Sequence, residues 1–132
     1  MYKIEKRSSG FMLTLGGSIE PAEMQKWLEE SKTMLAGVSG SFGVIVDMRT
    51  LAPLPPAAQA FMVEGQQLYK KAGMQRSAVI LNNAVTTLQF RRLAKESGIH
   101  AWERYLDASS EPQWQQKALD WVTSGKDPDK GK

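Results

Sequence analysis

The stretch Phe42-Gly43-Val44-Ile45-Val46-Asp47-Met48-Arg49 contains a nearly continuous apolar run, Val44–Met48, which a single acid interrupts. A second run of this kind, Ser77–Leu81, follows further along the chain. Near-continuous apolar runs of this length are typical of central strands that are covered on both faces, commonly in parallel sheets. The two segments therefore predict neighbouring central strands.

The chain between these two runs predicts a helix that connects them. Leu51–Pro56 carries three prolines, which favour an extended loop. Behind the loop, four residues recur at the spacing of one packed helix face: Phe61, Gly65, Leu68 and Ala72.

The residues before the first run predict a hairpin and a helix. Apolar and polar residues alternate on both sides of Ser8–Gly10, which is the pattern of two strands joined by a short turn. The charged first strand suits a sheet edge, where charges discourage pairing with other chains. Pro21 suits the first position of a helix, whose predicted inner face is Met24, Trp27, Leu28, Ser31 and Leu35.

The residues after the second run predict two further helices and a strand. A helix is expected over about 87–97, a strand over about 102–106, and a last helix that starts near 109–112 and ends at Gly125. The expected fold is α/β, with the order ββαβαβαβα and a five-stranded mixed sheet whose helices lie mainly on one face. Residues 1–124 should form one domain, and 125–132 a disordered tail.

Composition excludes several classes of protein. The 132 residues include no cysteine and one histidine, so disulfide frameworks and zinc ribbons are excluded. The net charge of +3 does not select a partner, and no dense basic stripe of the kind that nucleic-acid binders carry is present. No apolar run approaches the roughly 20 residues of a membrane span. We therefore expect a cytoplasmic protein with no integral membrane segment and no nucleic-acid partner.

The chain resembles the STAS group of anti-sigma-factor antagonists, especially its bacterial SpoIIAA-like branch. The resemblance rests on the order of elements, on the segment Phe42–Arg49 with the helix after it, and on Ala118–Val122. The resemblance covers nearly the whole chain and implies a small interaction or ligand-sensing module rather than an enzyme. In the antagonists, a serine at the start of the helix after the central strand is phosphorylated. The corresponding Pro53–Ala58 holds no hydroxyl, and Thr50 lies before the loop, so we do not expect this switch.

The sequence indicates no catalytic or metal site and no cofactor. His100 is the single histidine, and a glycine that should end the helix separates it from Ser97. Arg91 and Arg92 are neighbours that either bind an anion or form part of a solvated helix face. Asp47, at the end of its strand, either caps the following loop or contacts a ligand together with Arg49.

Apolar residues outside the predicted packed faces suggest a binding surface. Two lie in the proline loop, Leu51 and Leu54, and three on the helix after it, Ala58, Met62 and Tyr69. They form either an exposed patch for a protein partner or a second copy of the chain, or the flank of a wide buried stripe. The first expectation is a protein-interaction module. The alternative is a carrier or sensor of a small amphipathic, lipid-like ligand, because the branch is similar in fold to Sec14-type lipid-transfer domains.

Overall fold

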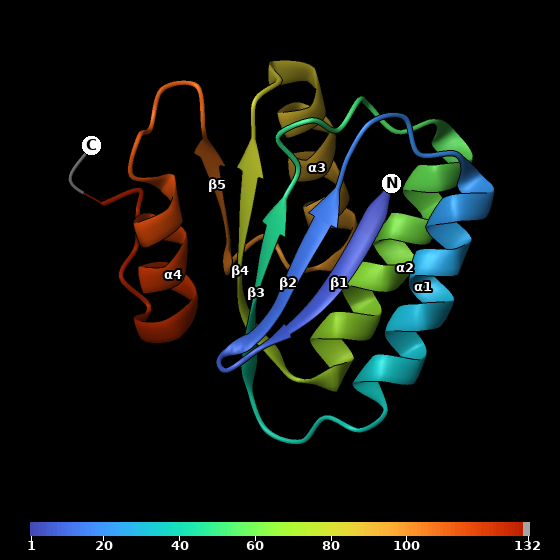
Figure 1. Ribbon diagram of the computed structural model, residues 1–132, viewed down its shortest axis with the longest axis horizontal. Coiled ribbons are helices and arrows are strands. Elements are labelled where there is room, and N and C mark those ends of the chain that lie inside the picture. The colour runs from blue at the N-terminus through green and yellow to red at the C-terminus, as the bar shows by residue number, and fades with distance from the viewer. Residues whose placement is uncertain (131–132) are drawn as a thin grey trace.

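The computed structural model describes residues 1–130 and confirms the predicted order of elements (Figure 1). The elements are β1 (Tyr2–Arg7), β2 (Gly10–Leu15), α1 (Pro21–Leu35), β3 (Phe42–Asp47), α2 (Pro56–Ala72), β4 (Met74–Leu81), α3 (Ala84–Ser97), β5 (Glu103–Asp107) and α4 (Trp114–Ser124). The fold is α/β with a five-stranded mixed sheet, as the pattern of apolar runs predicts.

The strands lie side by side in the same order as in the chain, β1-β2-β3-β4-β5. β1 is antiparallel to β2, and all other neighbours are parallel. The apolar β3 and β4 are interior strands, and the charged β1 is an edge strand. Helices α1, α2 and α3 lie on one face of the sheet, and α4 covers the other (Figure 1).

The larger core lies between the sheet and helices α1 to α3. The face of α1 that the sequence predicts is the buried one, with Met24, Trp27, Leu28, Ser31 and Leu35. The Trp27 ring stacks on Tyr69 with centroids 5.8 Å apart. Gly65 of α2 makes this close approach possible, because a Cβ there would lie 2.2 Å from the Trp27 ring.

The predicted inner face of α2 is partly wrong. Phe61, Leu68 and Ala72 are only half-buried, and the fully covered side chains lie on a neighbouring face. That face comprises Ala58, Met62, Gly65, Gln66 and Tyr69. The cause is that α2 packs against α1, α3 and the sheet at once, which covers a wider stripe than one helix face.

A second, smaller core lies between α4 and the opposite face of the sheet. It joins Ala118, Trp121 and Val122 to side chains of β4 and β5. The Trp121 indole nitrogen donates hydrogen bonds to the carbonyl oxygens of Ser77 at 3.0 Å and Trp102 at 3.2 Å.

The segment after α4, which the sequence predicts to be a disordered tail, lies against this core over residues 125–130. Gly125 adopts the left-handed conformation and ends α4, as its position in the sequence predicts. Arg104 then donates hydrogen bonds of 2.9 and 3.1 Å to the two carboxylate oxygens of Asp127, and Pro128 is buried. The packed unit thus extends past residue 124, and residues 131–132 of the expected tail lie outside the described residues.

Within residues 1–130, none of the four helices has the length and apolar character needed to cross a membrane.

Candidate functional site

The apolar surface patch expected in the proline loop and on α2 is buried. Each of its five side chains is at most 3% exposed: Leu51, Leu54, Ala58, Met62 and Tyr69. All five belong to the larger core. These residues therefore belong to a wide buried stripe, and they form no exposed patch.

Hydrogen bonds fix the proline loop against the N-terminal half of α3. The Thr86 hydroxyl donates to the Leu51 carbonyl oxygen at 3.3 Å. The Leu54 amide donates to the Gln89 side-chain oxygen at 2.7 Å, and the Gln89 side-chain nitrogen donates back to the Leu54 carbonyl at 3.1 Å. The loop is thereby tied to α3 at both Leu51 and Leu54.

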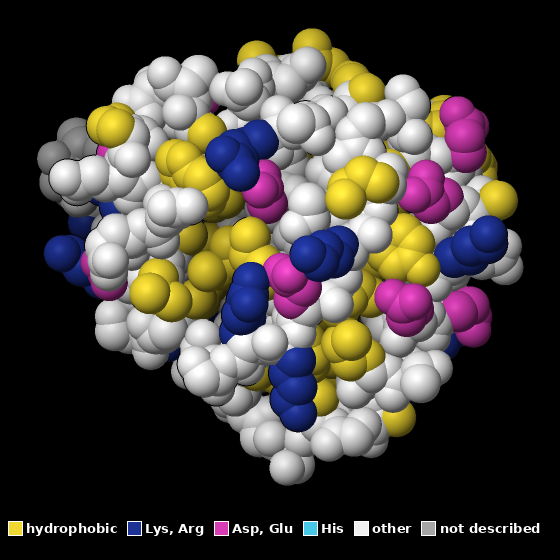
Figure 2. All heavy atoms as spheres, in the orientation of Figure 1, with side chains coloured by type: hydrophobic (Ala, Val, Ile, Leu, Met, Phe, Trp, Pro, Cys, Tyr) yellow, Lys and Arg dark blue, Asp and Glu magenta, His cyan; other side chains and the backbone are white. Residues whose placement is uncertain are grey.

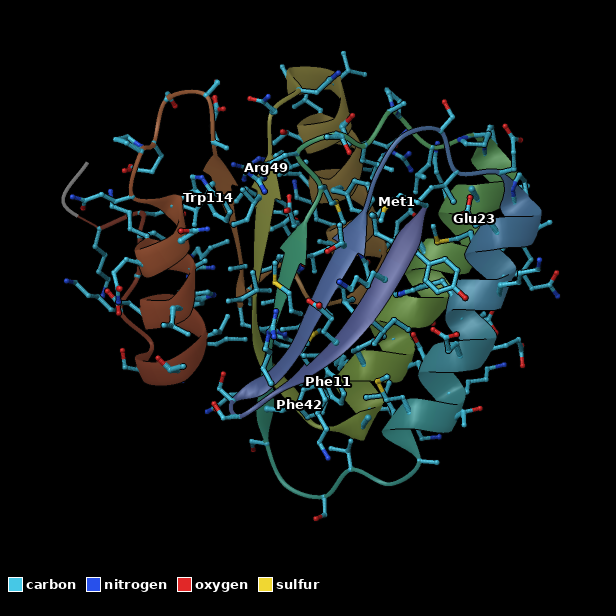
Figure 3. All side chains as sticks on the ribbon, in the orientation of Figure 1. Met1, Phe11, Glu23, Phe42, Arg49 and Trp114 are labelled. Atoms are coloured by element: carbon cyan, nitrogen blue, oxygen red, sulfur yellow. The ribbon has the colours of Figure 1, made fainter. Side chains whose placement is uncertain are left out.

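Asp47 caps the turn after β3. Its carboxylate accepts hydrogen bonds from the Arg49 backbone amide at 3.1 Å and from the Arg49 guanidinium at 3.0 and 2.9 Å. Burial alone would raise the pKa of Asp47, but the hydrogen bonds from Arg49 hold it below its usual value. The guanidinium also lies 4.6 Å from the centroid of the Trp114 ring (Figure 3), so it links the end of β3 to α4.

A surface groove lies where β4 and β5 end, next to the start of α3. We call it the α3 groove; it encloses about 550 Å³, and its lining includes Asn82, Thr87, Leu88, Arg91, Tyr105 and Asp107. Leu88 is 68% exposed and Val85, one turn before it, is 61% exposed. Among residues 1–130 these are two of the few large apolar side chains that face solvent.

The α3 groove carries charges of both signs. The Arg91 guanidinium lies 4.5 Å from the centroid of the Tyr105 ring. Asp107 accepts hydrogen bonds from the Ser109 hydroxyl at 2.6 Å and from its amide at 2.9 Å, which lower the pKa of Asp107. Arg92 is directed elsewhere, to Glu96 at 2.8 Å and to Gln59. The two neighbouring arginines therefore do not form a joint anion site.

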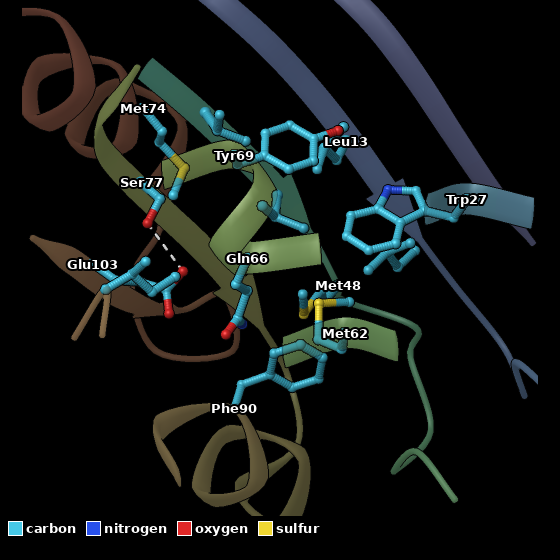
Figure 4. Close-up of a pocket in the computed structure, with 14 residues that line it drawn as sticks. Leu13, Trp27, Met48, Met62, Gln66, Tyr69, Met74, Ser77, Phe90 and Glu103 are labelled. Atoms are coloured by element: carbon cyan, nitrogen blue, oxygen red, sulfur yellow. Dashed lines mark hydrogen bonds between the residues drawn. The ribbon is translucent and has the colours of Figure 1, made fainter. Parts of the chain in front are cut away.

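A small cavity lies inside the larger core, with the buried acid Glu103 in its wall (Figure 4). Its volume is about 30 Å³, which is room for one or two water molecules. Glu103 accepts hydrogen bonds from the Ser77 hydroxyl at 3.0 Å and from the Tyr105 hydroxyl at 2.5 Å. Burial raises the pKa of Glu103 to about 7.

The side chains weighed for catalysis do not converge. The Ser97 hydroxyl is buried and donates to the Gln66 side-chain oxygen at 2.7 Å, whereas His100 is exposed in the turn after α3. Within residues 1–130, no group of three or more histidine, aspartate or glutamate side chains is placed to hold a metal ion.

Sequence reasoning did not find the α3 groove. The helix was expected to begin near Thr87, but it begins at Ala84 because the Asn83 side chain accepts hydrogen bonds from the amides of Val85 and Thr86. With this earlier start, Val85 and Leu88 share a helix face that the packed residues do not use. The signal was the asparagine before an apolar residue, which is a helix-capping pattern.

A comparison of the chain with protein-family models, curated proteins and solved structures finds no match.

Proposed function

We propose that this chain is a non-enzymatic, STAS-like protein-interaction module that lacks the phosphorylated serine of the antagonists. Its partner binds at the α3 groove. The observation that carries the proposal is the exposure of Leu88 and Val85 beside a groove at the carboxyl ends of two parallel strands. Exposed apolar side chains rimmed by polar groups mark interaction sites, and α/β sheets commonly bind at this end of their strands.

The chemistry of the α3 groove specifies the kind of partner segment. Leu88, in the lining of the groove, and Val85, exposed one turn before it, favour an apolar side chain. The Arg91 guanidinium, also in the lining, favours an acidic one. Arg91 is already oriented by the Tyr105 ring, so little conformational entropy is lost when it pairs with a carboxylate. The expected partner is a protein segment that presents an apolar residue close to an acid.

The interior of the fold gives less support to the alternative, a carrier of an amphipathic ligand. The cavity between the sheet and helices α1 to α3 measures about 30 Å³. An acyl chain needs a pocket of several hundred Å³, in the range of ordinary ligand sites. Carriage there would require helix α2 or α3 to move away from the sheet.

The test begins with site-specific crosslinking in the source cells. A photoreactive residue at position 88 should trap a protein that the same residue at position 119 does not. Leu119 is the matched control, because it is also an exposed leucine on a helix but lies on α4. The trapped protein is then purified, and its affinity for the variants is measured by calorimetry.

Leu88→Asp should weaken binding at least tenfold, because it places a carboxylate where an apolar contact and an acid of the partner are expected. Leu119→Asp should leave the affinity within twofold of the wild type. Equal crosslinking at positions 88 and 119, or full affinity of Leu88→Asp, would contradict the proposal.

A further inference from the structure

The outer edge of β1 is an open edge of the sheet. β1 pairs with β2 along all six of its residues, and no other described strand lies on its far side (Figure 1). An open edge offers backbone donors and acceptors to a further strand. The identity of that strand can be inferred from which groups face outward and which side chains lie beside them.

The backbone groups of the even-numbered residues of β1 face outward. Met1 and Gly16 exchange two hydrogen bonds, of 2.8 and 2.9 Å, at the start of the hairpin. Hydrogen-bonded and non-hydrogen-bonded pairs alternate along an antiparallel ladder. Lys3 and Glu5 therefore bond to β2, whereas Tyr2, Ile4 and Lys6 direct their amides and carbonyls away from the sheet.

The opposite edge of the sheet, at β5, is less available. The Glu103 carbonyl oxygen accepts a hydrogen bond from the Arg104 guanidinium at 3.1 Å. The strand is also shorter than β1. A side chain of the chain itself thus occupies one backbone acceptor at the β5 edge.

The side chains of β1 on the face that carries α4 alternate in sign. Lys3 and Arg7 lie on either side of Glu5 and pair with it, each at 2.9 Å. Figure 2 shows acidic and basic side chains intermingled on the side of the molecule that carries β1. A strand added here must match this alternation, because like charges directly opposite each other are destabilising.

We propose that a second copy of this chain pairs with β1, antiparallel and edge to edge, with Ile4 opposite Ile4 of the second copy. In this register Lys3 lies opposite Glu5 of the second copy, twice by symmetry. The outward backbone groups of Tyr2, Ile4 and Lys6 then meet those of Lys6, Ile4 and Tyr2. The two sheets join into one sheet of ten strands.

The neighbouring registers that keep the same faces aligned are unfavourable. A shift of two residues in one direction places Lys3 opposite Lys3, and a shift in the other places Glu5 opposite Glu5. A shift of one residue places the outward backbone groups of Ile4 opposite Lys3 or Glu5 of the second copy, whose own groups bond to β2, so the hydrogen bonds between the strands are lost. The charges that discourage general edge pairing therefore permit one symmetric register.

The other face of β1 adds a second charge match. Tyr2 lies in a hollow that Lys26, Glu29 and Glu30 of α1 also line, and its hydroxyl donates to Glu30 at 3.5 Å. Glu29 pairs with Lys32 at 3.3 Å, so Glu30 is the acid that concerns β1. In the proposed register, Lys6 of the second copy lies opposite Tyr2. Its ammonium group then lies on the same face as the Glu30 carboxylate and can pair with it.

Sedimentation equilibrium of the purified chain tests the proposal, and native mass spectrometry gives a second reading of the mass. The wild type should form dimers. Lys3→Glu alone and Glu5→Lys alone should each raise the dimer dissociation constant at least tenfold, because each variant makes two like-charge pairs. An equimolar mixture of the two variants should form a heterodimer, because its opposing charges again differ in sign.

The control is Lys71→Glu, which makes the same change in charge at the exposed end of α2 and should leave the dissociation constant unchanged. The chain has no cysteine, so disulfides provide a direct test of register. Lys3→Cys mixed with Glu5→Cys should oxidise to a mixed disulfide, because non-hydrogen-bonded pairs bring Cα atoms to about 4.5 Å.

A wild type that stays monomeric at about 100 μM would overturn the proposal. So would a mixture of the charge variants that fails to associate although both variants keep the circular dichroism of the folded wild type. Dimerisation is measured on the isolated chain, so its outcome is independent of whether the α3 groove binds a partner.

Discussion

Glu103 is a buried acid whose surroundings disfavour the ionised form of its carboxylate. It lies in the core with its carboxylate between the hydroxyls of Ser77 and Tyr105. The larger effect is burial, which disfavours the ionised form, and the two hydrogen bonds offset it in part. The pKa of about 7 means that the folded protein takes up a proton that the unfolded chain, with a carboxyl pKa near 4.5, has released.

This difference predicts that stability decreases as the pH rises. Below about pH 4.5 the carboxyl group of Glu103 is protonated in both the folded and the unfolded state. In this range its ionisation does not reduce the free energy of unfolding. Between about 4.5 and 7 the folded state binds more protons, so the free energy of unfolding should fall by on the order of 3 kcal/mol in total. Above pH 7 both states are ionised and the loss is complete.

Glu103→Gln should remove this part of the pH dependence, because the amide cannot ionise. Urea unfolding at several pH values measures the difference in free energy between variant and wild type. The free energy of unfolding of the variant, relative to that of the wild type, should increase as the pH rises to about 7 and then stay constant. Glu64→Gln, on an exposed part of α2, controls for the loss of one carboxyl. A parallel pH profile for Glu103→Gln and wild type would contradict the prediction.

At the scale of elements, the contact between α1 and α2 depends on the absence of a side chain at Gly65. Gly65→Ala should destabilise the protein by roughly 1 to 2 kcal/mol, because the overpacking cost against the Trp27 ring exceeds the gain in helix propensity. The ring is buried and stacked on Tyr69, so it cannot move aside easily.

Chemical denaturation measures this change in free energy. Gln67→Ala, two residues further along α2 and exposed, should alter it by less than about 0.5 kcal/mol. An unchanged or raised midpoint for Gly65→Ala would mean that α1 and α2 are further apart than described.

The buried face of α1 could be predicted from the sequence, whereas that of α2 could be predicted only in part. Helix α1 has one neighbouring helix and one polar side, so a single apolar stripe identifies its buried face. Helix α2 lies between two helices, and its second buried stripe was indistinguishable in the sequence from an exposed patch. The spacing of apolar residues along the sequence shows which faces of a helix are apolar. How many of these faces are buried depends on the number of helices and strands that pack against the helix.

The same limit applies to the candidate site. The ends of the parallel strands follow from the order of elements, so the edge at which Asp47 and Asp107 lie could be predicted. The α3 groove could not, because it depends on the start of α3 at Ala84 and on how far the β5–α4 loop lies from that helix. Both are set by packing between segments distant in sequence.

At the scale of the whole molecule, one sheet separates two cores of unequal size. Trp121 holds the smaller core: it is buried, its indole donates two hydrogen bonds, and the Arg104 guanidinium lies 4.3 Å from its ring centroid. Trp114, at the start of α4, is half-buried and contacts Arg49.

These differences predict unequal losses of stability for the two tryptophans. Trp121→Ala should lower the free energy of unfolding by roughly 3 to 5 kcal/mol, as for other large core truncations. Trp114→Ala should lower it by roughly 1 to 2 kcal/mol, because its ring is half-buried against the smaller core and makes one cation–π contact with Arg49. Equilibrium unfolding in urea measures both, and equal losses would show that α4 is not held mainly by Trp121.

The agreement between chain order and strand order has a consequence for synthesis on the ribosome. Each strand after the hairpin adds beside the one made just before it, so the growing chain can pair every new strand without inserting it between earlier ones. Helices α1, α2 and α3 can cover one face during this growth. Helix α4 emerges last among the elements, and until it docks, the apolar side chains of β3 to β5 on the other face stay uncovered. A nascent chain that stalls before α4 would therefore be a natural client for a chaperone that binds apolar strands.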